Sequence, residues 1–155
     1  MKTALIGLVS LAMVTTSSLT AHADGHAKDG WITQESANSV STTADKLVAA
    51  VEKAGAKVFA RVDHQAGAKS IGDDLPGATL VIFGNPKIGT PIMKSNIRAG
   101  LDLPIRVLIW EEGGKTLLGT TDPDALKERY SVTGADKALM TMKGALGKLM
   151  GAAAK

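Results

Sequence analysis

The sequence predicts a single α+β domain, a two-layer sandwich in which a mixed β-sheet has helices packed on it. Three observations support this class. Segments with strand-like and helix-like spacing of apolar residues alternate along the chain. Sixteen residues containing a helical pattern separate the strand at 57–62 from the strand that begins at Thr79, which is long enough for a parallel crossover. The pair Gly113-Gly114 is typical of a hairpin turn, so one strand pair is antiparallel.

The first 23 residues have the layout of a secretory signal peptide. Lys2 supplies a positive charge, and residues 4–14 form an apolar core shorter than the ~20 residues that span a bilayer. Ala21-His22-Ala23 places small residues before an expected cleavage site at Asp24. We therefore expect a periplasmic or secreted protein with no membrane anchor after cleavage. A flexible tail over residues 24–30 would precede one domain over residues 31–155.

Composition argues against several classes of function. Loss of Lys2 lowers the net charge from +3 to +2, and the few aromatic residues are not interleaved with basic ones, so nucleic-acid binding is not expected. The absence of cysteine excludes disulfides and a thiol nucleophile. After cleavage only His26 and His64 remain as histidines, so no metal or cofactor is expected. A weak site built from His26, His64 and Asp63 is a minor alternative.

The first half of the domain has recognisable element boundaries. Apolar and polar residues alternate loosely over 31–40, which could form a strand. The helix expected next has apolar residues at helical spacing, with Thr42 and Asp45 as a capping pair and Gly55 at its end. Residues 57–62 alternate as a strand. Asp63 would cap a short helix from His64 to Ile71 that stops at Gly72.

The second half contains three strands and two helices by the same reasoning. Residues 79–83 form a continuous apolar run, expected to be a strand buried on both faces, and residues 105–111 turn back through the glycine pair into 117–121. Asp122 before Pro123 indicates a helix start. The closing helix has one apolar stripe, formed by Leu139, Met142, Leu146, Leu149 and Met150. It also contains Gly144, Gly147 and Gly151, which suggest close approach to the sheet or to a partner's helix.

The loop after residue 83 is a candidate ligand site. Gly84 ends the strand, Asn85-Pro86 is a turn dipeptide, and Thr90-Pro91 resembles a helix start, with Thr90 as the cap. Free backbone N–H groups at such a start, with Lys87 nearby, would suit a small anionic ligand. The alternative is a rigid connection between a strand and a helix. No phosphate-loop pattern is present, because Thr90 and Pro91 follow Gly89 where lysine and serine or threonine are required.

Asp63 and His64 form the second candidate ligand site. They follow the strand ending at Val62 as Asn85 follows the strand ending at Phe83, and if these strands were parallel neighbours both loops would open at one edge of the sheet. A surface histidine in a capping region is the simpler interpretation of His64. No nucleophile-elbow pattern surrounds a serine in the mature domain.

Together these segments resemble a known family. The stretch "VFARVDHQAGAKSIGDDLPGATLVIFGNPKIGTPIM" followed by "AGLDLPIRVLIWEEGGK" is similar to the bacterial and archaeal family called domain of unknown function 302, from about residue 41 to about residue 130. The resemblance implies a compact α+β homodimer and no established reaction, cofactor or substrate. Two features depart from the family pattern: Thr120 and Thr121 replace a common aromatic and asparagine, and Tyr130 stands where many members have histidine.

Three hypotheses about function follow. The first is a periplasmic small-ligand-binding or accessory protein, with a shallow site formed by Asp63, His64, Asn85, Lys87, Thr90 and Asp102. The second is a hydrolase or isomerase that uses His64 with Asp63 or Asp102 as an acid–base pair. The third is a structural or stress-protection homodimer, which predicts a large apolar patch and no polar cleft.

Overall fold

The computed structural model describes residues 30–155 as one five-stranded sheet with helices. The strand order is β1-β5-β4-β3-β2, and every neighbouring pair is antiparallel. The strands are β1 (Trp31–Ser36), β2 (Lys57–Asp63), β3 (Ala78–Gly84), β4 (Ile105–Glu112) and β5 (Lys115–Thr121). The helices are α1 (Val40–Lys53), α2 (His64–Ser70), α3 (Pro86–Ser95), the 3-10 helix η1 (Ile97–Leu101), α4 (Pro123–Arg129) and α5 (Asp136–Ala153).

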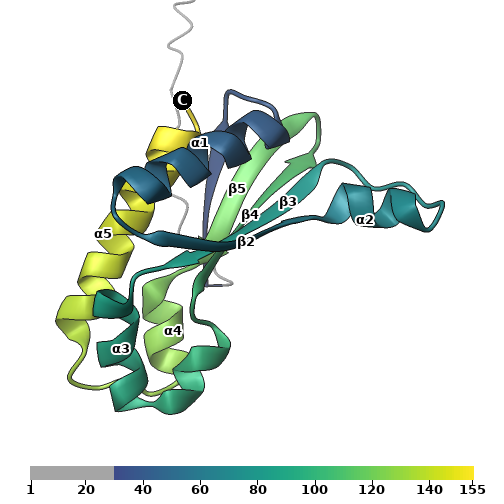
Figure 1. Cartoon of the computed structure of the whole chain (residues 1–155). Helices are drawn as coiled ribbons and strands as arrows, with labels where there is room; N and C mark the ends of the chain where they lie inside the picture. The colour runs from purple at the N-terminus through teal and green to yellow at the C-terminus, as the bar shows by residue number, and fades with distance from the viewer. Residues whose placement is uncertain (1–29) are drawn as a thin grey trace, which may run out of the picture.

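One face of the sheet is covered and contains the core. Helices α1 and α5 lie side by side on this face, while α3 and α4 gather at one end of the sheet and α2 projects as an arm (Figure 1). Side chains of β3 and β4 that point toward α1 and α5 are buried, as are the apolar stripes of both helices. The main members of this core are Leu47, Val51, Val81, Val107, Ile109, Leu118, Leu146 and Met150, all 2% exposed or less.

The opposite face of the sheet is not covered by α1 or α5. Along β3, Thr79, Val81 and Phe83 are buried, whereas the residues between them are only half-buried. The prediction that residues 79–83 are buried on both faces is therefore wrong. The alternation is that of an antiparallel sheet with a single packed face.

The predicted α+β class with helices packed on one sheet is confirmed, but the sheet is antiparallel throughout rather than mixed. Residues 63–78 do not cross over the sheet: Asp63 pairs with Thr79, so β2 and β3 form a long hairpin with α2 at its tip. The physical reason lies in α2 itself, which has no buried residue. A crossover helix must bury an apolar face on the sheet, and His64–Ser70 contains no large apolar side chain to do so.

Several local predictions are confirmed. Asp63 caps α2 by accepting a hydrogen bond from the Ala66 N–H at 2.9 Å, and Gly72 follows the helix at φ +79°. Asp122 caps α4 with Pro123 in its first turn. Gly113 and Gly114 turn the β4–β5 hairpin at φ +58° and +76°, and the predicted apolar stripe of α5 is buried.

Two helix starts differ from the prediction. Helix α1 begins at Val40, because Ser39 rather than Thr42 is the capping residue and accepts from the Thr42 N–H at 3.3 Å. Helix α3 begins at Pro86 with Asn85 as its cap, so Thr90 is not a cap and Pro91 lies inside the helix. The start was placed too late because Asn-Pro was interpreted as an isolated turn.

The predicted signal peptide at 1–23 and the predicted tail up to Asp29 lie outside the described residues, as does His26. Gly30, the last residue of that tail, is described and accepts a hydrogen bond from the Asp122 N–H at 2.8 Å. Within residues 30–155, no helix combines the length and the hydropathy of a membrane span.

The glycines of α5 do not serve close packing within the described chain. A Cβ atom added at Gly144 or Gly147 would meet nothing within 4 Å, which corrects the expectation that they allow close approach to the sheet. Replacing both by alanine should raise the free energy of unfolding by about 1 kcal/mol per site, because alanine favours a helix more than glycine. Urea denaturation measures this, with Gly30→Ala as a contrast: its Cβ would lie 2.9 Å from that of Ala125 at φ +76°, and it should destabilise. A lower midpoint for the double variant would contradict the account.

Candidate functional site

The six predicted ligand-binding residues do not form one site. Asp63 pairs with Thr79 at one end of the β2–β3 hairpin, whereas Gly84, the residue before Asn85, pairs with Lys57 at the other. Thr79 and Gly84 are five strand residues apart, which corresponds to roughly 17 Å. Asp63 and His64 therefore lie at the opposite end of the sheet from Asn85. The predicted shared edge is wrong because it assumed that the two strands are parallel.

The enzymatic alternative receives no geometric support. Asp102 lies three residues before Ile105, which pairs with Phe83, so it is at the far end of the sheet from His64. The Asp63 carboxylate, which is adjacent to His64, is engaged as the cap of α2. Among residues 30–155 there is also no group of three His, Asp or Glu side chains that could hold a metal ion.

The backbone at the start of α3 does not offer a free anion site. The Lys87 N–H donates to the side-chain oxygen of Asn85 at 2.9 Å. The N–H groups of Ile88 and Gly89 donate to the Asn85 carbonyl at 2.9 and 3.0 Å, and Pro86 has no N–H. The donors of the first turn are thus used within the helix, and the basis for predicting an anionic ligand at Thr90-Pro91 disappears.

The same loop instead forms one wall of an apolar pocket. The pocket has a volume of about 260 Å³, is partly open to solvent, and lies between the end of β3, α3, the segment before β4, and α5. Of the six predicted residues, Asn85 and Thr90 line it, whereas Asp63, His64, Lys87 and Asp102 do not. Its apolar lining includes Phe59, Phe83, Ile88, Met93, Leu103, Ile105, Met142, Ala145 and Leu149.

The local structure explains why a hollow remains here. A Cβ at Gly84 would lie 3.3 Å from the Pro104 side chain, so glycine lets the chain pass close to the segment before β4. Gly89 and Ala145 contribute little side-chain volume from α3 and α5. The pocket thus lies where β3, α3 and α5 each contribute a small residue to its lining. Asn85 and Thr90 are the polar residues of its lining, and no charged residue of the described chain lines it.

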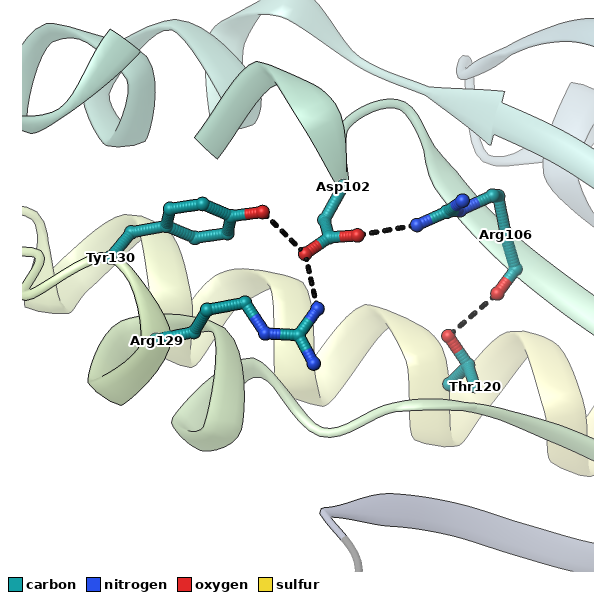
Figure 2. Close-up of polar contacts among 5 residues, drawn as sticks. All are labelled: Asp102, Arg106, Thr120, Arg129 and Tyr130. Carbon is teal, nitrogen blue, oxygen red and sulfur yellow. Dashed lines mark hydrogen bonds and ion pairs between the residues drawn. The ribbon is translucent and has the colours of Figure 1, made fainter. Parts of the chain in front are cut away.

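Asp102 belongs to a separate polar cluster beside this pocket. Figure 2 shows its carboxylate between three donors from other elements: the Tyr130 hydroxyl at 2.7 Å, the Arg129 guanidinium at 2.9 Å and the Arg106 guanidinium at 2.5 Å. Asp102 is only 9% exposed. The cluster joins the end of η1 to β4 and to the end of α4.

The charge state of the Asp102 cluster follows from its partners. Burial by itself would raise the pKa of Asp102, but hydrogen bonds from Tyr130 and Arg129 and the positive charges of Arg129 and Arg106 outweigh it. The pKa of Asp102 is therefore lower than its ordinary value. The hydrogen bond to Asp102, together with burial, raises the pKa of Tyr130, so its hydroxyl remains a donor. All three donors bind one carboxylate, so Asp102 links η1 to β4 and to the end of α4.

Sequence reasoning did not find this cluster, although it singled out part of it. Tyr130 and Thr120 depart from the family pattern, and the structure places both in this cluster. Thr120 donates its hydroxyl hydrogen to the Arg106 carbonyl at 2.8 Å (Figure 2). Thr121 pairs with Trp31 on the neighbouring strand instead. Arg106 and Arg129 carried no signal, because nothing in the sequence shows that they face Asp102.

Comparison with known proteins agrees with the fold. The sequence model described as "Domain of unknown function DUF302" matches residues 32–149. The chain belongs to the DUF302 family. This confirms the family that the motifs predicted and extends the match beyond residues 41–130. A crystal structure of an uncharacterized conserved DUF302 protein from Bacillus stearothermophilus has a TM-score of 0.72 with 16% identity, over 81% of this chain and 98% of that one, and it supports the fold.

Curated relatives of this DUF302 chain are longer than the chain itself. Proteins named "Fluoride-specific ion channel FluC 1" from Brucella suis and Brucella abortus are each 45% identical over 124 residues, which is 77% of this chain. The matched region covers 49% and 46% of those proteins. The chain thus spans about half the length of the curated relatives it matches.

Proposed function

We propose that this DUF302 chain is an exported protein that binds a small, mostly apolar molecule in the pocket at the end of β3. The observation that supports it is the pocket itself, a hollow with a mostly apolar lining that includes two polar residues, Asn85 and Thr90. Ligand sites in proteins commonly have this composition, with a few polar groups that orient the bound molecule.

The dimensions of the pocket limit the class of ligand. A volume of about 260 Å³ exceeds the roughly 150 Å³ of a cavity that holds benzene, and lies just below the usual range of about 300–1,000 Å³ for ligand sites. A short acyl chain or a one- or two-ring aromatic molecule fits this range. The Asn85 side-chain oxygen already accepts from Lys87, so its amide N–H group is available to a ligand oxygen.

Titration with a series of straight-chain alcohols from 1-butanol to 1-decanol tests this function by calorimetry. Each methylene buried in the pocket contributes about 0.8 kcal/mol, so the affinity should rise about four-fold per carbon. It should then level off once the pocket is full. Affinity that does not depend on chain length, or no binding by any member of the series, would argue against an apolar ligand site.

Export to the periplasm is part of the same proposal and is supported by the charged, apolar and small-residue segments of residues 1–23. The mass of the protein recovered from its own cells should correspond to a chain beginning at Asp24. Recovery of the chain with Met1 in the cytoplasm would contradict export. We also infer that two copies of the chain pair, as the family resemblance implies.

An accessory role in fluoride handling is a second candidate, favoured by the 45% identity to proteins named fluoride-specific ion channels. Deleting the gene should then make cells more sensitive to fluoride in the medium, with chloride at equal concentration as the control salt. Equal growth of the deletion and parent strains in fluoride would remove this candidate.

A further inference from the structure

The uncovered face of the sheet presents a continuous apolar surface. Cross-strand pairing places Leu80 opposite Leu108 and Trp110 opposite Leu117, all pointing away from α1 and α5. Val62 pairs with Leu80 at the β2 side of the same face and is 39% exposed. Every one of these side chains remains partly exposed, whereas the covered face is almost completely buried.

Two tryptophan rings lie over a glycine at the centre of this face. A Cβ at Gly119 would lie 3.1 Å from the Trp110 ring and 3.3 Å from the Trp31 ring, so both indoles pack closely over the glycine backbone. Large contiguous apolar patches on soluble proteins mark interaction sites. A patch of aromatic and aliphatic side chains without charge at its centre has the composition of the core of a protein–protein interface.

We propose that a second copy of this chain covers this face, sheet against sheet, about a two-fold axis. This deepens the inference that two copies pair and is independent of the pocket. Five strands about 4.8 Å apart and about 20 Å long give roughly 500 Å² per copy, or about 1,000 Å² in total before the relief of side chains is counted. This flat estimate reaches the roughly 1,000 Å² that a biological interface should exceed, and the relief of the side chains adds to it.

The distribution of charged side chains on this face favours a second copy of the same face as its binding partner. The charged side chains of this face lie at its two ends: Glu35, Glu112 and Lys115 at the β4–β5 hairpin end, and Lys57 and Arg106 at the other. Lys115 pairs with Glu35 at 2.8 Å and Arg106 with Asp102, which leaves Glu112 at one end and Lys57 at the other without an ion pair among the described residues. A two-fold axis running across the strands brings the end of one copy that carries Lys57 and Arg106 toward the hairpin end of the other, whose two glutamates outnumber its lysine. The face is therefore complementary to itself, as a symmetric dimer requires.

Sedimentation equilibrium between 1 and 100 µM tests the proposal with matched variants. We expect the wild-type protein to have twice the chain mass and Leu108→Glu to dissociate at least 100-fold more readily, because it places a charge at the centre of the interface. Ile97→Glu is the control, since Ile97 is 77% exposed on η1, outside this face, and should leave the dimer unchanged. Far-ultraviolet circular dichroism verifies that each variant is folded.

A milder variant and an optical signal complete the test. Thr33, which pairs with Gly119 on the same face, is half-buried, and Thr33→Lys should weaken the dimer even if Leu108→Glu fails to fold. Both tryptophans of the chain lie on this face, so their emission should shift to longer wavelength as dilution separates the copies. A wild-type monomer at 100 µM, or variants of the face that dimerise as tightly as the Ile97→Glu control, would overturn the proposal.

Discussion

Replacing Ala145 by phenylalanine should weaken the binding of 1-octanol roughly 50-fold. Ala145 lines the pocket from α5, between Met142 and Leu149 on the same helix. An aromatic ring at this position would occupy space that the alkyl chain needs. Displacing about three methylenes removes ~2.4 kcal/mol of apolar burial, which corresponds to this change in affinity. Titration calorimetry on the wild-type and variant proteins measures it directly.

The matched control for this variant is Thr141→Phe. Thr141 lies one turn earlier on the same helix, is exposed and does not line the pocket. It adds a similar aromatic side chain to α5 without filling the pocket, so octanol affinity should stay at the wild-type value. If the Ala145 variant is folded and binds octanol as tightly as this control, the pocket is not the binding site.

Asp102→Asn should lower the free energy of unfolding by about 2 kcal/mol at neutral pH. The substitution keeps the shape of the side chain but removes the charge on which Tyr130, Arg129 and Arg106 converge, and hydrogen bonds to a charged acceptor are stronger than neutral ones. The cost stays moderate because the Arg106 and Arg129 side chains are 46% and 62% exposed and can be hydrated by water. Urea denaturation at pH 7 measures the difference.

The same variant should show a characteristic pH dependence. Because the folded protein lowers the pKa of Asp102, the carboxylate stabilises the fold above the ordinary value of 3.8, and this stabilisation is lost as pH falls through the lower folded value. The difference between wild type and Asp102→Asn should therefore be constant near neutral pH and shrink below about pH 4. A difference that grows as the solution becomes more acidic would contradict this role for Asp102.

Asp136→Asn is the appropriate comparison for that experiment. Asp136 bonds Lys127 at 2.6 Å, but this carboxylate is 63% exposed. Solvent screens such a pair, so its removal should have little effect on stability at any pH. An equal loss of unfolding free energy in Asp102→Asn and Asp136→Asn would mean that burying Asp102 among its donors adds no stability.

Much of the fold could be predicted from local patterns. Caps such as Asp63 and Asp122, the Gly113-Gly114 turn and the apolar stripe of α5 each depend on residues close in sequence, and the structure bears them out. The direction of β2 relative to β3 is different, because the length of their connection permits either arrangement. The absence of large apolar side chains in His64–Ser70 was the signal against a crossover.

The site was harder to predict for a related reason. Polar residues after two strands drew attention to Asp63, His64 and Asn85, but their grouping depended on the wrong strand direction. The pocket is formed mostly by apolar residues distributed from Ala54 to Leu149, and each of them looks like an ordinary core residue in the sequence. The one signal in the sequence is the glycine- and proline-rich segment after β3. Its residues from Gly84 to Thr90, except Lys87, line the pocket, which is mostly apolar rather than suited to an anion.

Native mass spectrometry of the protein isolated gently from the cells that produce it tests the central claim most directly. The account predicts a bound small molecule that is released into organic solvent, and it predicts that Ala145→Phe prepared in the same way has lost that molecule. Finding the bare polypeptide mass for the wild-type protein, or the same adduct on both proteins, would contradict a ligand site at the end of β3.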